Sequence, residues 1–381
     1  MDFNGLLALL GTILTGYVPP FLFVLTIVVF FHELGHFLVA RWCGVNVKVF
    51  SIGFGPEIFG WYDKYGTRWR MSWIPLGGYV RFLDDDGAAS TPNRQQIEAM
   101  SDAEKAGSFH LKPVGSRAAV VAAGPIANFI LAIVIFTLTF WFIGREVTEA
   151  RVDQVAPDSA AAAAGFRPGD LIKSIDGEKI NDFNQLQRIV SGSAERVLMV
   201  VVERDGAELT LTATPQWKEI TDRFGNKQKV GLLGITRNAG EGGYRLETYG
   251  LADSFKMALK ETWFVVARTF EYLYDIVVGR QDADQLGGPL RIAQASGQVA
   301  TLGILALIQL AAFLSVSIGL LNLFPVPLLD GGHLVFYAIE AVRGRPLSEQ
   351  SQEWGFRIGL ALVLALMFFA TWNDIVHFGA L

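Results

Sequence analysis

The sequence contains little charge and almost no cysteine. Only 18% of its 381 residues are Asp, Glu, Lys or Arg and 51% are hydrophobic, whereas about 25% charge is usual in globular proteins. Cys43 is the single cysteine, which excludes an intrachain disulfide and a cluster of thiolate metal ligands. No Lys or Arg precedes Arg41, so the basic start of an ordinary cleaved signal peptide is missing. We therefore expect a membrane protein that also carries a soluble part.

One short motif supplies all the ionisable side chains between Phe21 and Ala40. It reads His32-Glu33-Leu34-Gly35-His36. On a helix this spacing places two imidazoles on one face with a carboxylate beside them, the arrangement that binds Zn²⁺ next to a general base. The alternative is a chance occurrence. Because ionisable groups are costly in hydrocarbon and mark function there, we favour a metal site.

Four apolar stretches predict four transmembrane helices. The first run would be too long for a ~30 Å hydrocarbon core, and Pro19-Pro20 is expected to break it. The sequence then divides into seven parts. They are a first segment with the HExxH motif (1–43, with span 1 at about 21–42), a loop (44–117), span 2 (118–143), a domain outside the membrane (146–215), a linker with interfacial helices (216–301), span 3 with the segment after it (302–342), and span 4 (356–372).

The basic residues of the short loops predict the orientation. Residues 1–20 and 373–381 contain no Lys or Arg, whereas the loops 44–117 and 325–357 carry several. Since basic loops stay in the cytoplasm, both termini and the long 144–301 segment are expected outside. His32 then lies roughly 16 Å along span 1, toward the cytoplasmic side.

A catalytic zinc needs a third protein ligand, and Asp330 is the strongest candidate. Pro325 and Pro327 precede it and are expected to end or unwind the helix of span 3, which would keep Asp330 near the depth of the two histidines. Such irregular backbone survives in a membrane only where protein or a water-filled cavity surrounds it. The alternative is that Asp330 caps the next helix. Cys43 is about 10 Å away along its helix, and His110 and His377 read as ordinary surface histidines.

Residues 45–60 and 67–82 alternate apolar and polar side chains with glycines between them. They predict a small β-sheet associated with the membrane on its cytoplasmic side. A free edge of this sheet is expected to pair with an unwound substrate by strand addition. The alternative is a cytoplasmic cap without substrate contact.

Residues 146–215 predict one small α/β domain. Its predicted strands and helices alternate with Asp176-Gly177 and Asp205-Gly206, which are typical of hairpin turns. The segment from Ala164 to Asp170, with the strand and turn that follow it, resembles bacterial PDZ domains, which bind extended peptide ends by adding a strand. After it, residues 252–279 predict an aromatic-rich helix at the outer membrane interface. A helix in the core of the soluble domain is the alternative.

Several motifs together resemble one known family. The HELGH motif and Asn322-Leu323-Phe324-Pro325-Val326-Pro327-Leu328-Leu329-Asp330-Gly331-Gly332-His333 are the paired signature of the site-2 protease family of intramembrane zinc metalloproteases, closest to its RseP/RasP branch (regulator of sigma-E protease). Further matching stretches are Gly53–Pro56, Pro75–Val80, Ala123–Phe129 and Gly287–Ala293. Some members of the family carry two PDZ-like domains in tandem, whereas this chain has room for one.

The resemblance implies a mechanism and a set of site residues. His32, His36 and Asp330 bind Zn²⁺, and Glu33 is the base that activates the attacking water. Asn322 and Asn128 are candidates to hydrogen-bond the substrate or the oxyanion, although either could instead bond between helices. The candidate substrate-binding residues are Asn322, Pro325, Pro327, Gly53, Gly55 and Asn128.

The expected fold is a polytopic α-helical membrane protein with four transmembrane helices, a small membrane-associated β-sheet and one inserted extracytoplasmic α/β PDZ-like domain. The expected function is intramembrane cleavage of single-pass membrane proteins, such as an anti-sigma factor already cut outside or remnant signal peptides, in the bacterial cytoplasmic (inner) membrane.

The expected partners are the substrates, the lipid bilayer and peptide C-termini at the PDZ-like domain, with no nucleic acid. The PDZ-like domain could bind the new C-terminus of a substrate or filter substrates by size, and we favour the filter.

A non-proteolytic membrane scaffold with a structural metal site is the alternative, but it would not need Glu33. A metal transporter would show inverted repeats, and none is evident in the sequence.

Overall fold

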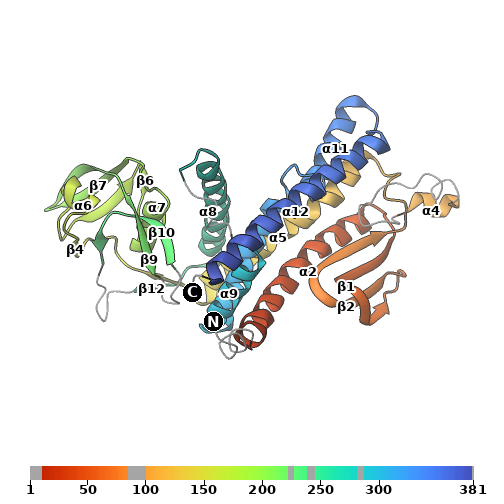
Figure 1. Cartoon of the computed structure of the whole chain (residues 1–381), viewed down its shortest axis with the longest axis horizontal. Helices are drawn as coiled ribbons and strands as arrows, with labels where there is room; N and C mark the ends of the chain where they lie inside the picture. The colour runs from red at the N-terminus through yellow and green to blue at the C-terminus, as the bar shows by residue number, and fades with distance from the viewer. Residues whose placement is uncertain (1–10, 85–99, 222–226, 238–244, 281–286, 380–381) are drawn as a thin grey trace. The chain divides into compact units, whose positions relative to one another are not determined.

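A computed structural model describes residues 11–84, 100–221, 227–237, 245–280 and 287–379 (Figure 1). The chain forms two compact units. The helical unit comprises the residues up to Thr137 and those from Phe255 onward, and the inserted unit comprises Leu138–Ser254.

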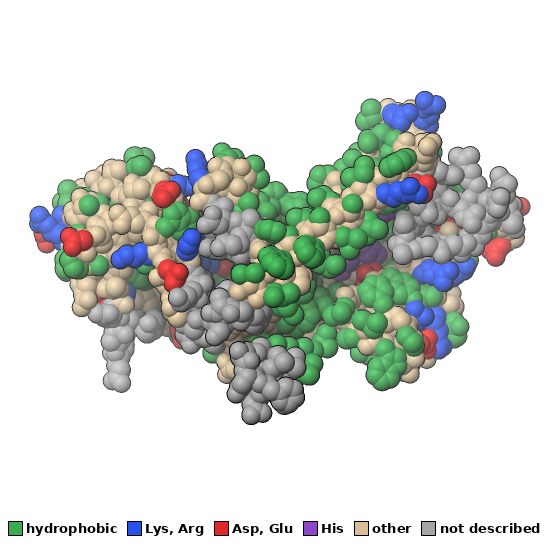
Figure 2. All heavy atoms as spheres, in the orientation of Figure 1, with side chains coloured by type: hydrophobic (Ala, Val, Ile, Leu, Met, Phe, Trp, Pro, Cys, Tyr) green, Lys and Arg blue, Asp and Glu red, His purple; other side chains and the backbone are tan. Residues whose placement is uncertain are grey.

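The helical unit contains four helices that are long and apolar enough to cross a membrane among the described residues. They are α2 (Val18–Trp42, joined to the π-helix η1, Ile13–Tyr17), α5 (Val114–Phe142), α10 (Ile304–Asn322) and α12 (Glu349–Gly379). Their surfaces carry exposed apolar side chains (Figure 2), such as Phe368 on α12, which is 71% exposed. A helix that is apolar all round suits lipid. The four predicted spans are therefore present as helices.

The expected break at Pro19-Pro20 is absent. The helix runs through both prolines, which occupy the first turn of α2, where a missing N–H costs nothing and the fixed φ suits a helix. The π-helical turn η1 comes directly before them, and the N–H of Val18 bonds to the carbonyl of Ile13. This wider turn joins the two segments without a gap, so the first candidate span is Ile13–Trp42.

Two long strands, β1 (Val47–Tyr62) and β2 (Arg68–Phe82), form the predicted sheet. Each strand bends, and residues 49–52 of β1 pair with 78–81 of β2 on one side and with 68–71 on the other. The bend of β1 contains Gly53 and Gly55, with φ of 87° and 86°, a conformation that favours glycine. The two strands therefore make a curled sheet of four segments with 57–62 at one edge and 78–82 at the other.

The sheet packs on α2 through aromatic side chains. Phe50 is 1% exposed, and its ring centroid lies 5.6 Å from that of Phe37 on α2 and 4.3 Å from that of Trp69 on β2. These rings belong to one buried cluster that also contains Val120 of α5. Burial of large aromatic side chains is a major source of stability, so the cluster fixes the sheet against the end of α2.

A tight loop joins α10 to α11 (Asp330–Arg343). Glycines after the loop allow its close packing, because a Cβ at Gly331 would lie 2.3 Å from the carbonyl oxygens of Leu323 and Phe324. The N-cap position of α11 is held by Leu329, without a side-chain hydrogen bond. Asp330 is thus the first residue of α11, and the capping role considered from the sequence is not seen.

Among the described residues, the helical unit has three further helices: α4 (Asp102–Ala106), α8 (Leu251–Val277), which begins in the inserted unit, and α9 (Pro289–Ala300). The carboxylate of Asp374 on α12 is fully buried and accepts hydrogen bonds from the N–H groups of Gly288 and Leu290 at 2.8 and 3.0 Å. A carboxylate suits the unpaired N–H groups of a helix start. The last span therefore holds the first turn of α9, which packs against α2.

The predicted helix 252–279 is present as α8. Its aromatic residues Phe255, Trp263, Phe270 and Tyr274 are 48% to 71% exposed. Such exposure suits the interfacial helix that the sequence predicts better than a core helix.

The inserted unit is built on an antiparallel sheet with strand order β6-β5-β7-β8. Its turns at Asp176-Gly177 and Asp205-Gly206 have positive φ at both residues, as two-residue hairpin turns require, and both turns were predicted. Ser159 and Asp182 cap the two short helices with side-chain bonds. The elements are β5 (Leu171–Ile175), β6 (Glu178–Lys179), β7 (Leu198–Arg204), β8 (Ala207–Ala213), α6 (Ala160–Ala164) and α7 (Phe183–Ser191).

This unit extends beyond residue 215, where the sequence analysis placed its end. Strand β11 (Ile235–Thr236) pairs with β4 (Gln154–Val155), and Leu233 is 1% exposed within the core. The part beyond residue 215 was not predicted, because its strands are short and contain few apolar residues. The other strands are β3 (Arg145–Val147), β9 (Gln216–Thr221), β10 (Lys227–Leu232) and β12 (Arg245–Glu247).

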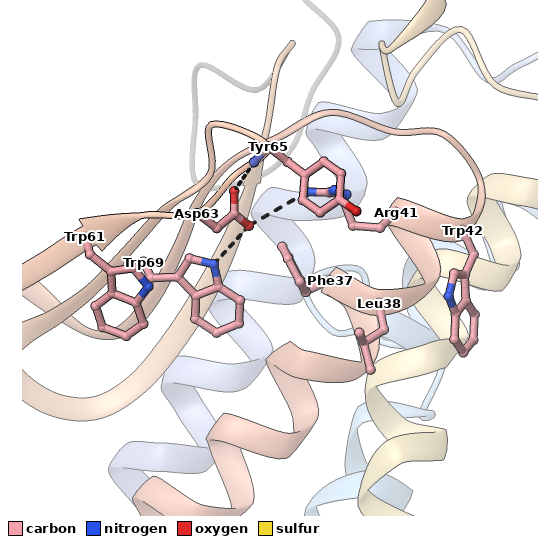
Figure 3. A pocket seen from close by; sticks show the side chains of 8 residues that line it. All are labelled: Phe37, Leu38, Arg41, Trp42, Trp61, Asp63, Tyr65 and Trp69. Carbon is pink, nitrogen blue, oxygen red and sulfur yellow. Dashed lines mark hydrogen bonds and ion pairs between the residues drawn. The ribbon is translucent and has the colours of Figure 1, made fainter.

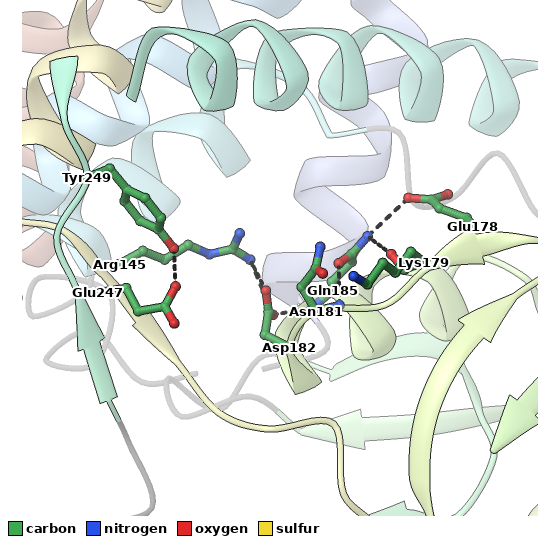
Figure 4. Close-up of polar contacts among 8 residues, drawn as sticks. All are labelled: Arg145, Glu178, Lys179, Asn181, Asp182, Gln185, Glu247 and Tyr249. Carbon is green, nitrogen blue, oxygen red and sulfur yellow. Dashed lines mark hydrogen bonds and ion pairs between the residues drawn. The ribbon is translucent and has the colours of Figure 1, made fainter. Parts of the chain in front are cut away.

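Strands β3 and β12 pair with each other and are tied to α7 by polar contacts (Figure 4). Arg145 on β3 lies 3.0 Å from Asp182, whose carboxylate also caps α7 by accepting from the N–H of Gln185 at 2.7 Å. Tyr249, just after β12, donates to Glu247 at 2.5 Å. Burial and the Glu247 carboxylate raise the pKa of Tyr249 to about 12. These bonds fasten both ends of the inserted unit to its core.

A buried ion pair predicts how the inserted unit responds to pH. Asp170 is 1% exposed. Burial raises the pKa of its carboxyl group, but hydrogen bonds from Arg204 and the Arg167 N–H outweigh this and hold the pKa below its usual value. Since the folded pKa is the lower one, the stabilisation is present above the unfolded pKa of about 3.9 and is lost as pH falls through the folded pKa. We expect Asp170→Asn to destabilise the unit by about 3 kcal/mol at pH 7, and by less below about pH 4.

Hydrogen exchange over residues 150–204 of the full chain measures this effect. Asp205→Asn is the matched control, because Asp205 is exposed in a turn with positive φ that Asn also tolerates. Equal protection for Asp170→Asn and wild type at pH 7 would contradict the prediction.

Candidate metal centre

Helix α2 places the two histidines of the HExxH motif side by side. Four residues apart, His32 and His36 lie on one face, with ring centroids 4.8 Å apart and their Nε2 atoms separated by 3.2 Å. The i, i+4 spacing on a regular helix suffices for this approach. Both side chains are only 13% exposed, so two imidazole nitrogens face one small region.

The first turn of α11 brings Asp330 to the same region. Its Oδ2 atom lies 3.2 Å from Nε2 of His32, and its Oδ1 atom lies 3.6 Å from Nε2 of His36. One ligand atom from each of the three residues falls within 4.8 Å of the others. The loop that contains Pro325 and Pro327 therefore keeps the Asp330 carboxylate near the two histidines, as the prolines predict.

The distances between these three residues suit a tetrahedral metal ion. Bonds of about 2.0–2.2 Å from zinc to nitrogen and oxygen place neighbouring ligand atoms about 3.3–3.5 Å apart. The two Nε2 atoms are 3.2 Å apart, and the two Asp330 oxygens approach them separately, Oδ2 at 3.2 Å from His32 and Oδ1 at 3.6 Å from His36. Asp330 Oδ2 is buried and has no well-aligned hydrogen-bond partner among the described residues, which a cation would remedy. Two imidazoles and one carboxylate leave a fourth position open, as catalytic zinc sites do.

The surroundings of His36 select the tautomer that can bind a metal. Its Nδ1 atom lies 2.9 Å from the carbonyl oxygen of Val120. A carbonyl only accepts hydrogen bonds, so Nδ1 carries the proton and Nε2 keeps its lone pair toward Asp330. A histidine that donates from its second nitrogen to a backbone carbonyl is typical of metal ligands.

Two glycines allow α2 and α5 to approach closely enough to form the site. A Cβ at Gly35 would lie 2.3 Å from the carbonyl oxygen of Ala123, and one at Gly124 would lie 2.3 Å from Nε2 of His36. Any larger residue at Gly124 would thus occupy the space of the histidine rings. From the sequence, Gly124 stands out only as part of the family-like stretch Ala123–Phe129. Its proximity to the motif depends on a register between helices that the sequence does not reveal.

Glu33 is held by the edge segment 78–82 of the sheet. A Cβ at Gly78 would lie 2.9 Å from Cγ of Glu33, and the backbone N–H of Val80 hydrogen-bonds the Glu33 carboxylate. The strand that carries the Pro75–Val80 motif therefore orients this carboxylate beside the two histidines. The sequence analysis did not identify Gly78 and Val80 as contacts of Glu33.

The other predicted site residues lie in different places. Asn128 on α5 is fully buried with its amide nitrogen 3.2 Å from Nδ1 of His32, which is the bond between helices that the sequence analysis weighed against substrate contact. Asn322 is half-buried at the end of α10. Pro325 and Pro327 form the loop before Asp330, and Gly53 and Gly55 form the bend of β1. His110 and Cys43 are not among the three clustered ligand residues; the side chain of His377 is outside those described.

A separate pocket of about 680 Å³ lies between the end of α2 and the sheet (Figure 3). Arg41 stacks over the ring of Tyr65 at 3.8 Å and lies 3.9 Å from Asp63. Asp63 in turn accepts from the N–H of Tyr65 and the indole of Trp69 at 2.8 and 3.2 Å. The pocket is lined by Phe37, Leu38, Arg41, Trp42, Trp61, Asp63, Tyr65 and Trp69. It contains none of the clustered ionisable residues, and its polar contacts join the turn of the sheet to α2.

Comparison with known proteins gives one consistent result. The sequence model of peptidase family M50 matches residues 20–366. A protein of Agrobacterium fabrum that is named a zinc metalloprotease is 53% identical over 372 residues, which cover 98% of both chains. The metalloprotease MmpA of Caulobacter vibrioides is 43% identical over 93% of this chain and 94% of its own. The zinc metalloprotease RasP of Geobacillus kaustophilus is 30% identical over 94% and 97%.

The close packing at Gly124 predicts a specific loss of metal. We expect Gly124→Ala to lower zinc affinity by about tenfold or more, because its Cβ would displace the His36 ring. Zinc content after purification, measured by mass spectrometry against a chelator series, reports this loss. Gly115→Ala is the matched control, since it lies on the same helix and a Cβ there meets nothing within 4 Å. Full zinc retention by Gly124→Ala would show that the rings do not need this space.

Proposed function

The chain belongs to peptidase family M50 and is a zinc metalloprotease, and we propose that it cleaves its substrates within the membrane. Family membership confirms the resemblance to site-2 proteases. The observation that carries the proposal is that His32, His36 and Asp330 converge on one point, with both histidines inside the first candidate span. A soluble protease has no reason to keep ionisable groups in such a helix.

His32, His36 and Asp330 are the proposed zinc ligands, with one position left for water. Bound zinc lowers the pKa of its water toward about 7 and polarises the scissile carbonyl. The carboxylate of Glu33 accepts the proton of the attacking water and later delivers it to the nitrogen of the leaving amine. The hydrogen bond from Val80 holds this carboxylate on the side of the histidines while the proton is transferred.

The site is proposed to lie near the cytoplasmic side of the inner membrane. His36 precedes the end of the first candidate span at Trp42 by six residues, about 9 Å along a helix, and the basic loop 44–117 follows. Since basic loops stay inside, the two termini and the inserted unit are placed outside.

The substrate is proposed to be a single-pass membrane protein that unwinds and pairs with the curled sheet. A transmembrane helix has no free backbone groups, so it must open before hydrolysis. The edge segment 78–82 touches Glu33, which brings a strand added there next to the base. Gly53, Gly55, Asn322, Pro325 and Pro327 are also proposed to contact the substrate. Anti-sigma factors already cut outside, or remnant signal peptides, are the proposed classes.

The inserted unit is proposed to be a PDZ-like domain that filters substrates by the size of their outside part. Its four-stranded sheet with two capped helices suits such a domain. Among the described residues, strands β11 and β4 form a two-stranded sheet. Each strand therefore has one edge without a partner strand in this sheet, where a peptide end could add as a further strand. Capture of a substrate C-terminus is therefore the second role to test.

A cleavage assay tests the catalytic proposal. Wild-type protein is expected to cut a tagged single-pass substrate within its span, and Glu33→Gln to reduce the rate by about 10²–10⁴-fold while zinc remains bound. Wild-type protein and Glu33→Gln are compared in vesicles by mapping the cut site and measuring zinc content. Equal cleavage by the two proteins would remove Glu33 from its assigned role.

The same assay separates the two roles of the inserted unit. A bulky folded domain on the outside of the substrate slows cleavage if the unit is a filter, and deletion of residues 146–250 restores the rate. If the unit instead captures peptide ends, the deletion slows cleavage of the short substrate.

Gly78→Ala is expected to impair catalysis without removing the metal. Its Cβ would lie 2.8 Å from the carbonyl oxygen of Ser51 on the paired strand and 2.9 Å from Cγ of Glu33, and a displacement of about 1 Å of a catalytic group can reduce the rate about 10²-fold. We expect kcat to fall by about that factor while KM and zinc content stay near wild type. Gly115→Ala serves as the control, and limited proteolysis of the sheet checks that it remains folded. A raised KM with unchanged kcat would contradict the assigned contact.

A further inference from the structure

Asn128 is a buried polar residue that contacts His32, and the mechanism above does not use it. It is fully buried on α5, and its Nδ2 atom lies 3.2 Å from Nδ1 of His32. Its Oδ1 atom is buried and makes no hydrogen bond among the described residues. An amide kept entirely away from water and left half-satisfied needs a physical reason.

The neighbouring helix holds Asn128 in place. Ser315 on α10 donates to the carbonyl oxygen of Asn128 at 2.9 Å. A Cβ at Gly319, one turn further along α10, would lie 3.1 Å from Cβ of Asn128. The residue is thus clamped between α10 and His32, and the two orientations of its amide group occupy almost the same space.

Metal binding fixes which atom of the amide must face His32. A neutral imidazole that uses Nε2 as a ligand carries its proton on Nδ1, and this proton needs an acceptor. An amide nitrogen cannot accept, whereas Oδ1 can. The nitrogen and oxygen of an Asn amide occupy almost the same shape and are distinguished by their hydrogen-bond partners. A half turn of the amide therefore brings Oδ1 against Nδ1–H.

We propose that Asn128 is a positioning residue that selects the metal-binding tautomer of His32 by accepting a hydrogen bond from Nδ1–H. In the opposite orientation, Nδ2 donates to Nδ1, and the imidazole proton sits on Nε2, where it blocks metal binding. In His36, Nδ1–H instead donates to the fixed backbone carbonyl of Val120 at 2.9 Å. The two histidines thus differ, since His36 depends on a backbone carbonyl and His32 on a side-chain amide. This inference rests on the proposed ligand role of His32.

Substitutions of nearly equal volume test the acceptor. Asn128→Leu removes it, and we expect the zinc dissociation constant to rise about 10–100-fold, as for other groups that orient metal-binding histidines. Asn128→Asp presents an oxygen in either orientation and is expected to stay within about threefold of wild type. Zinc affinity is measured on the full chain by competition with a chelator. Thr137→Val is the control, because Thr137 is a buried polar residue of α5 that bonds to its own helix at Ile133.

A second readout reports the tautomer directly. Nitrogen NMR of histidine-labelled protein is expected to show a protonated Nδ1 for His32 in zinc-loaded wild type and in Asn128→Asp. Equal weakening by Asp and Leu would mean that Asn128 only packs, and unchanged affinity in Asn128→Leu would overturn the proposal. Neither measurement uses proteolysis. The role of Asn128 can therefore be tested even if the proposed cleavage reaction is not observed.

Discussion

The close approach of α2 and α5 is the constraint on which the metal site depends. At Gly35 and Gly124 the two helices come so near that a single methyl group would collide with backbone or with an imidazole ring. This approach puts the carbonyl of Val120 and the amide of Asn128 within reach of the histidines. Helices in lipid gain little from burying apolar side chains against each other, so small residues and polar contacts must join them. The same contacts that hold the helices together therefore also hold the two imidazole rings.

The clustering of His32, His36 and Asp330 was more predictable than the contacts that surround it. The HExxH spacing and the prolines before Asp330 identify three clustered residues, because helix geometry and proline stereochemistry are local rules. The contacts of Gly78 with Glu33 and of Asn128 with His32 depend on how distant segments pack, which no local rule gives.

The fold differs from the prediction in two places and is more elaborate in a third. Pro19-Pro20 was predicted to break the helix, yet a local π-helical turn accommodates it. The predicted small sheet is present, but the sequence does not reveal that each strand bends and pairs on both sides. The inserted unit was predicted to end at residue 215, yet it includes short strands from further along the chain. In the sheet and the inserted unit, pairing between separate segments decides between conformations that the local sequence permits.

The carboxylate of Asp374 has a consequence for how the protein is made. It accepts hydrogen bonds from the start of α9, although Asp374 is synthesised more than eighty residues later. Until that last helix leaves the ribosome, the first turn of α9 has unpaired N–H groups, and its packing on α2 lacks its anchor. The segment that carries the histidines thus enters the bilayer long before its supports arrive. The packing of α9 on the histidine-bearing helix is therefore completed only late in biogenesis.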